Sequence, residues 1–306
     1  MPAPQWKRQP SPCPPPGVYE GVDSDTYHAW DAVNASMLKQ AGLDRGTRSW
    51  AKVHHYLTGP LELSGGHMYL GRAWHAALLE PEDYAARAVV LDSVVRPSTG
   101  KENKLSESAA PEVWAAAQNQ CPGCYVLSDD MAATVRGMTD TARRHERVKT
   151  LLGLESRREL SLVWDDEETG LRCKCRLDWW IDGGAERGTV VDLKSTRDAR
   201  PWSFNRDVER LGYFFSLAFY GEGVRRHLSS IAPNFVLIAQ EKEAPFDLRI
   251  YELHSLYIEL GRVLFRDMLH QFARCYIAGA WTGYPSETLD LVPSPHLLAG
   301  YPEITQ

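Results

Sequence analysis

Two neighbouring segments decide the fold of this chain: Arg-Leu-Asp-Trp-Trp-Ile-Asp-Gly-Gly at residues 176–184 and Thr-Val-Val-Asp-Leu-Lys-Ser-Thr at residues 189–196. Both contain the apolar, β-branched and aromatic residues that favour strands, and the glycine pair that ends the first segment is a turn signal. The sequence therefore predicts that the two segments form a β-hairpin.

Charged side chains meet at one end of this hairpin. Side chains alternate along a strand, so Asp192 and Lys194 share one face and Leu193 takes the other. A turn near residues 183–188 brings Asp178 within a residue or two of Asp192 in register. Two carboxylates and an ammonium then converge, and this arrangement suits a hard cation bound by oxygen atoms.

The Asp-x-Lys tripeptide also occurs on solvated strand faces and in surface ion pairs that have no function. Here the strand around it is apolar, because it contains Val190, Val191 and Leu193. The charged pair therefore lies beside a core and not on a loop, and this context favours a functional site.

Length and composition bound the class of protein. The chain has 306 residues, enough for one large domain or two small ones, and 43% hydrophobic with 24% charged residues is typical of a soluble globular protein. We expect a cytoplasmic protein, since no apolar run is long enough for a membrane span and no secretory signal is apparent. The net charge of −6 counts against broad coating of DNA but permits an enzyme with a local basic groove.

The order of predicted elements indicates one α/β (α+β) domain, with a mixed central sheet flanked by helices and an N-terminal helical layer. We expect a proline-rich disordered leader at 1–16, a single domain at 17–290 and a tail at 291–306. Periodicity predicts helices first, at 34–40, 48–57, 68–80, 106–119 and 128–149, with a polar loop over 92–111. It then predicts strands at 159–164, 171–181, 189–195, 234–240 and 248–253, with helices at 207–220 and 254–280.

Six cysteines are present, and without a secretory signal we expect no disulfides. Cys121 and Cys124 have knuckle-like spacing, and Cys173 with Cys175 would complete four ligands for zinc or an iron–sulfur cluster. Small buried thiols account for Cys173 and Cys175 equally well.

Two further candidate residues precede the hairpin. His75 follows Gly71 by one turn of a predicted helix, and Glu159 begins the first predicted strand of the meander. A helical histidine is often simply packed, and a glutamate at a strand end often lies on the surface. Both alternatives stay open from these residues alone.

Other residues suggest contacts to a substrate. Lys174 and Arg176 alternate with Asp178 and should share its face, while Tyr213 and Tyr220 share one face of a helix unless they only pack in the core. Basic residues also cluster directly after the Asp-x-Lys strand, where they suit phosphate contacts unless they form a solvated face: Arg197, Arg200, Arg206 and Arg210.

In order and spacing, these motifs resemble the PD-(D/E)XK nucleases of the RecB-like branch, especially the exonuclease VIII (RecE) type found in phages and prophages. The stretches that resemble this family, besides the candidate residues, are 17–21, 70–81, 211–220 and 281–284. The resemblance covers roughly residues 17–290 and implies a restriction-endonuclease-like core.

The resemblance also implies a metal site. Asp178 and Asp192 would hold Mg²⁺, or Mn²⁺, with the Leu193 carbonyl as a further ligand. His75 would be an additional ligand or would orient one, and Glu159 would support the site. The residue types suit this chemistry independently, because Mg²⁺ prefers carboxylate and carbonyl oxygens.

Lys194 would position or deprotonate the attacking water and offset charge on the phosphate. Tyr220 would close the family's Gln-x-x-x-Tyr helix motif, in which this chain has Ser216 in place of the glutamine. The shorter serine predicts an altered substrate contact and leaves the metal site intact. The residues expected to contact DNA are Tyr213, Ser216, Tyr220, Lys174, Arg176 and Arg197.

By this resemblance, the protein is expected to be a metal-dependent exodeoxyribonuclease that digests linear double-stranded DNA from 5′ to 3′. The product would be a 3′ single-stranded tail for recombination, in the cytoplasm of a bacterial or phage-infected host. The resemblance further implies a homo-oligomeric ring and an annealing protein as partner. The alternatives are a related nuclease that acts on single-stranded or branched DNA or RNA, and a non-catalytic DNA-binding protein on the same fold.

Overall fold

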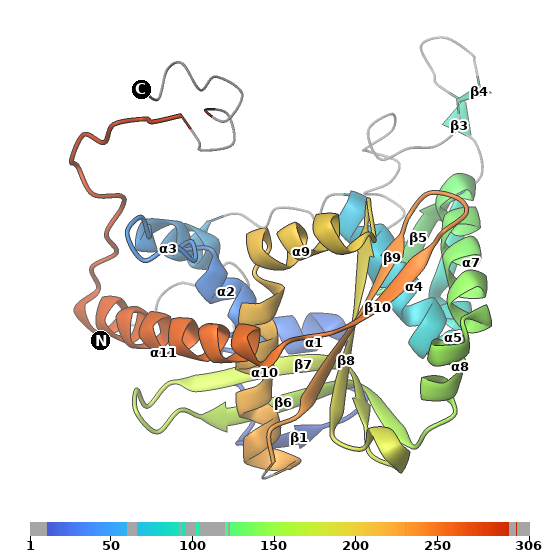
Figure 1. Cartoon of the computed structure of the whole chain (residues 1–306), viewed down its shortest axis with the longest axis horizontal. Coiled ribbons are helices and arrows are strands. Elements are labelled where there is room, and N and C mark those ends of the chain that lie inside the picture. The colour runs from blue at the N-terminus through green and yellow to red at the C-terminus, as the bar shows by residue number, and fades with distance from the viewer. Residues whose placement is uncertain are drawn as a thin grey trace.

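A computed structural model of the chain describes residues 11–59, 66–91, 94–95, 102–103, 120–121, 123–229, 231–293 and 298. Its centre is a six-stranded sheet in the order β1-β6-β7-β8-β9-β10 (Figure 1). These strands are β1 (Gly17–Tyr19), β6 (Ser156–Asp165), β7 (Arg172–Ile181), β8 (Thr189–Thr196), β9 (Asn234–Glu241) and β10 (Leu248–Glu252). Only β8 and β9 pair in parallel, and the other neighbours are antiparallel. The predicted mixed sheet is confirmed.

Helices cover both faces of this sheet (Figure 1). The helices that pack on one face are α2 (Ala35–Lys39), α3 (Trp50–Thr58), α9 (Pro201–Arg210), α10 (Tyr213–His227) and α11 (Ser255–Ala278). Those on the other face are α4 (Gly66–Leu79), α7 (Asp129–Arg144) and α8 (Glu146–Leu152). Among the described residues, no helix combines the length and apolarity needed to cross a membrane.

Smaller elements complete the fold. Their bounds are α1 (Ser24–Ala29), α5 (Pro81–Arg87), η1 (Gly184–Glu186), β2 (Ala88–Leu91), β3 (Val94–Val95), β4 (Glu102–Asn103) and β5 (Tyr125–Ser128). Strand β2 pairs with β5 in parallel, and β3 pairs with β4 in antiparallel orientation. The sequence patterns did not predict β1, α1 or this pair of small sheets.

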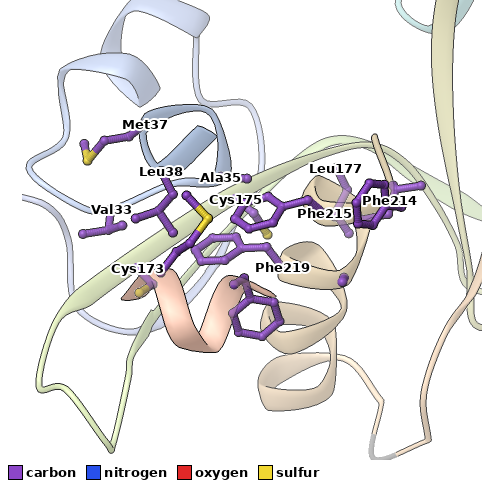
Figure 2. Close-up of a cluster of buried hydrophobic side chains, with 14 of the residues drawn as sticks. Val33, Ala35, Met37, Leu38, Cys173, Cys175, Leu177, Phe214, Phe215 and Phe219 are labelled. Carbon is purple, nitrogen blue, oxygen red and sulfur yellow. The ribbon is translucent and has the colours of Figure 1, made fainter. Parts of the chain in front are cut away.

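The main core lies between β7, α2 and α10. Figure 2 shows Cys173 and Cys175 of β7 beside Phe215 and Phe219 of α10. Both thiols are buried in this apolar cluster, so they do not join Cys121 and Cys124 in a metal site. The latter two form a disulfide, contrary to our expectation of none.

One predicted helix is interrupted. The sequence predicts a single helix over 207–220, but α9 ends at Arg210 and α10 starts at Tyr213. Gly212 between them has a φ of 63°, which breaks the helical path and which glycine adopts without strain. The chain therefore turns between two helices and does not continue through one.

The described part of the predicted leader contacts the domain. Ser11 forms a β-bridge with Trp30, and an Arg172 N–H donates to the Pro14 carbonyl over 2.6 Å. Residues 1–10, the predicted helix at 106–119 and nearly all of the predicted loop and C-terminal tail lie outside the described residues.

Helices α10 and α11 pack in close contact because one residue of α11 is glycine. A Cβ on Gly261 would lie 2.7 Å from both the Phe214 carbonyl oxygen and the Ala218 Cβ.

Gly261→Ala should therefore destabilise the protein by about 1–3 kcal/mol, despite the better helix propensity of alanine. Urea denaturation measures this change, and Gly283→Ala, where a Cβ meets no atom within 4 Å, is the control. Equal stability of Gly261→Ala and the wild type would contradict this packing.

Candidate active site

The central sheet forks between β7 and β8. These strands pair only over Trp179–Ile181 and Thr189–Val191, after which β7 continues against β6 and β8 against β9. Asp178 and Asp192 are the next residues on each side, so they lie where the strands begin to diverge. The Leu193 N–H donates to Asp178 Oδ2 over 2.9 Å across the opening. The predicted hairpin and its register are confirmed.

The alternation of side chains slips at the same level of the sheet. Leu177 and Trp180 contact the core cluster on one face, while Trp179 contacts the cluster on the other. Leu177 and Trp180 are three positions apart, so strict alternation would place them on opposite faces of the sheet. Because they share a face, the alternation is broken between them. On β6, beside Asp178, Glu159 has a φ of 49°, which is uncommon outside glycine. The distortion places Glu159 and Asp178 together at the fork.

Helix α4 supplies a third candidate ligand from the other side. A Cβ on Gly71 would lie 3.2 Å from Ser195 Oγ, so the glycine allows α4 to approach β8 closely. One turn later, His75 Nδ1 lies 3.5 Å from Asp178 Oδ2. The Gly-x-x-x-His spacing thus has a physical reason, because the glycine permits the approach that the histidine needs.

Three residues could hold a metal ion together. Ligand atoms of His75, Glu159 and Asp178 all lie within 4.8 Å of one another. Asp192 lies beside them with its carboxylate in an ion pair with the Lys194 ammonium. Glu159, which was expected to support the site, thus lies among the candidate ligands together with the predicted His75 and Asp178.

Burial makes the ionised form of each carboxyl at the site costly, although Arg176 and Lys194 partly offset it. Burial, together with the neighbouring Asp178 charge, raises the pKa of Glu159 to about 7. Burial also raises the pKa of Asp178 and of Asp192, although Lys194 lowers both. A divalent cation among these carboxylates would relieve this energetic penalty, so the residues fit such a metal.

The histidine is suited to bind a metal as the neutral ring. Burial, with the nearby Lys194 charge, lowers the pKa of His75 to about 4. Neutral imidazole is the form that ligates metals, so His75 does not have to lose a proton near neutral pH. The carboxylates suit both Mg²⁺ and Mn²⁺, and the imidazole favours the transition metal of the two.

Lys194 is held as an ammonium. Burial opposes its charge, but the carboxylates of Asp192 and Asp178 outweigh burial and raise the pKa of Lys194. Its Nζ donates to the Leu193 carbonyl over 3.3 Å and lies 5.0 Å from the centre of the Tyr213 ring. Lys194 is therefore equipped to offset negative charge.

One neighbouring residue was missed by the sequence analysis. Lys39 of α2 donates from Nζ to the Leu211 carbonyl over 3.0 Å. Burial and the charge of Lys194 lower the pKa of Lys39 to about 8. Since Lys39 lies close enough to be affected by Lys194, it is a second basic side chain near the site. No motif could have indicated this residue, because a separate helix brings it there.

The prediction that Lys174 contacts DNA is wrong. Its side chain is buried, and its ammonium donates over 2.7 Å to the carbonyls of both Tyr27 and Trp30. These carbonyls belong to the C-terminal end of α1, where a lysine can satisfy the free acceptors and the helix dipole. Lys174 thus fixes α1 on the sheet.

Ser216 is also enclosed by the protein. It is buried, and its hydroxyl donates to the Gly212 carbonyl of the preceding turn over 3.3 Å. Tyr220, one turn later, lies near Asp192 and Asp178, and burial raises its pKa far above the usual value. The predicted tyrosine position at the site is therefore present, while the predicted contact from Ser216 is not.

Two predicted arginines have different surroundings. Arg176 Nε donates to Glu159 Oε2 over 2.6 Å, so it neutralises a candidate ligand. Arg197 is exposed just beyond β8 and has no ion pair with any described residue. Of the two, Arg197 is the one free to meet a phosphate.

Lys174→Met should lower the free energy of unfolding by about 2–4 kcal/mol, because it removes charge-assisted hydrogen bonds and leaves buried carbonyls unpaired. DNA affinity per folded molecule should stay unchanged. Urea denaturation and fluorescence anisotropy test both statements, with the exposed Lys52→Met as control. If Lys174→Met is as stable as the wild type but binds DNA more weakly, Lys174 contacts DNA as first predicted.

Glu159→Gln should change the pH dependence of stability. The Glu159 carboxyl has a pKa of about 7 in the folded protein and 4.5 in the unfolded chain. Its contribution to the free energy of unfolding is therefore fully present below pH 4.5 and is lost as the pH rises through 7. In EDTA, Glu159→Gln should therefore gain up to about 3 kcal/mol over the wild type across this window, since glutamine stays neutral. His75 titrates in both proteins and largely cancels in the difference.

Urea denaturation of both proteins at several pH values measures this gain. Adding Mn²⁺ at neutral pH should reduce or reverse it, because only the wild type offers a carboxylate at this position. A difference that stays constant from acidic to neutral pH would contradict the proposed environment of Glu159.

Comparison with known proteins agrees with this geometry. Residues 47–294 match the family described as PDDEXK-like domain of unknown function (DUF3799). A crystal structure from Eubacterium rectale, described as "Putative exonuclease", aligns over 92% of this chain and 99% of its own, with a TM-score of 0.58 and 14% identity, so the fold is shared. The solved structure of SSO0001 aligns over 65% of this chain and 84% of its own at 12% identity, but its TM-score of 0.28 is too low for any argument.

No curated protein matches this sequence. The family match nevertheless covers most of the chain, from the start of α3 to beyond α11. The resemblance to PD-(D/E)XK nucleases is thereby confirmed, and the chain belongs to the PDDEXK-like domain family.

Proposed function

We propose that this protein is a metal-dependent exodeoxyribonuclease that acts on linear double-stranded DNA. The observation that carries the proposal is the group of His75, Glu159 and Asp178 beside the Asp192–Lys194 ion pair. Membership of a PDDEXK-like family supports a nuclease, and the name of the Eubacterium rectale protein is consistent with an exonuclease.

The residues at the fork would hold the metal and stabilise the reacting phosphate. A bound divalent cation supplies a Lewis acid for a phosphoryl oxygen and lowers the pKa of water. Asp178, Glu159 and His75 would hold it, and Asp192 would add a further carboxylate beside them. Lys194, protonated beside Asp192, would offset the charge that builds on the phosphate. The raised pKa of Lys194 favours offsetting charge over accepting a proton.

The finer features of the proposal come from the resemblance to RecE-type enzymes. They are digestion from 5′ to 3′, a 3′ single-stranded product for recombination, an annealing protein as partner and assembly into a ring. Mg²⁺ is the proposed cofactor, and Mn²⁺ is expected to replace it. The exposed Arg197 beyond β8 is the proposed phosphate contact.

Asp192→Ala and Lys194→Ala should each reduce cleavage of linear duplex DNA by at least about 100-fold. Binding of the same DNA in EDTA should remain, because these changes remove chemistry and not the bulk of the interface. The assay uses duplexes labelled at either the 5′ or the 3′ end, with Mg²⁺, with Mn²⁺ and with EDTA. The exposed Asp290→Ala serves as the matched control and should cleave like the wild type.

Metal-dependent release of 5′-labelled mononucleotides by the wild type would support the activity and its direction together. Release from the 3′ label first would keep the nuclease and reject the direction. If linear, nicked and single-stranded DNA all remain intact with Mg²⁺ and with Mn²⁺, the proposal is wrong and a non-catalytic DNA-binding role replaces it.

A further inference from the structure

Helix α9 presents an aromatic side chain to solvent. Trp202 is 74% exposed, whereas the other tryptophans in the described part of the chain are buried or half-buried. A side chain of this size usually finds a partner, and an exposed one next to basic residues indicates a recognition surface. No part of the proposed metal site uses it.

The exposure does not come from a loosely held helix. Phe204 and Val208 bury the inner face of α9 in the core, and the Phe204 ring stacks on Tyr251 at 5.1 Å. The Tyr251 hydroxyl also donates to the Ala199 carbonyl just before the helix. Trp202 is therefore carried on a fixed element.

A cation accompanies the ring. The Arg206 guanidinium, one turn after Trp202, lies 4.9 Å from the centre of that ring. Neither Arg206 nor Arg197 has an ion-pair partner among the described residues, whereas Arg200 is paired with Asp198 and Arg210 is paired with Asp207. Two guanidiniums without an ion pair thus lie on the segment that follows β8, and one of them accompanies an exposed aromatic ring.

The helix that carries this surface lies close to the proposed reaction centre. Helix α9 begins shortly after the end of β8, the strand that carries Asp192 and Lys194 (Figure 1). The Phe204 ring lies 6.2 Å from the Tyr213 ring, which in turn lies 5.0 Å from Lys194 Nζ. One layer of aromatic side chains separates the helix from the catalytic lysine.

We propose that Trp202, with Arg206, is a stacking site for an unpaired nucleobase of single-stranded DNA beside the cleavage site. Bases stack on an aromatic face without regard to sequence, and guanidinium groups follow the phosphates of the same strand. Inside a duplex, stacked neighbours cover both faces of a base, so the site favours an unpaired base of the opened strand. This inference rests on the proposed nuclease function and adds the element that receives a separated strand.

Trp202→Ala should weaken binding of fluorescein-labelled oligo(dT) by about 5- to 100-fold in fluorescence anisotropy. The measurement is made in EDTA, so that no cleavage occurs. Trp202→Phe should keep most of the affinity because it retains a ring. Binding of a blunt duplex of the same length should change by less than about threefold. Arg206→Gln should weaken oligo(dT) binding and reduce the salt slope by about one.

The control is Ile231→Ala, which truncates another exposed apolar side chain away from α9. Unfolding temperatures should match across the set, because these side chains are exposed. The inference is overturned if Trp202→Ala binds oligo(dT) like the wild type, if Ile231→Ala loses as much affinity, or if duplex binding falls equally. It is also overturned if the wild type does not bind oligo(dT).

These outcomes separate the inference from the proposed function. An active exonuclease with an unaffected Trp202→Ala would reject only the stacking site. Absent cleavage, together with a ring-dependent loss of oligo(dT) affinity, would reject only the nuclease and leave a single-strand binding protein.

Discussion

The site depends on the point where β7 and β8 stop pairing. Up to Trp179 and Val191 the two strands form an ordinary ladder, and beyond it each strand follows a different neighbour. The opening leaves room for Asp178 and Asp192 at the base of the fork, with apolar clusters on both faces of the sheet. This partial enclosure by the protein raises the pKa values of the acids at the fork.

The electrostatics follow from the same burial. Carboxyls at the fork bind protons more tightly than usual, and the histidine beside them binds a proton less tightly. On the proposed function, such a site would exchange protons for a divalent cation. The same carboxylates stabilise the Lys194 ammonium, because their charges raise its pKa. The fold thereby sets both the proton affinity of the candidate ligands and the charge of the lysine.

Local patterns in the sequence predicted the hairpin well, because strand alternation and a glycine turn fix the register of Asp178 and Asp192. They failed where the backbone departs from regular geometry. No pattern predicted the positive φ of Glu159 or the slip near Asp178, which bring these two carboxyls together at the fork. Lys174 was misplaced because its partner, the end of α1, lies far away in the chain. Ser216 was misplaced because its motif came from a resemblance, whereas its own hydroxyl bonds within the helix.

The central claim is that the fork is a metal centre built from His75, Glu159 and Asp178. Anomalous diffraction from a crystal of the protein soaked with Mn²⁺ tests it most directly, because manganese can be located without reference to the chain. The account predicts one or two manganese peaks at the fork, within bonding distance of a carboxylate oxygen of Asp178 and at least one of the other two residues. Manganese found elsewhere, or an empty fork at saturating Mn²⁺, would contradict it.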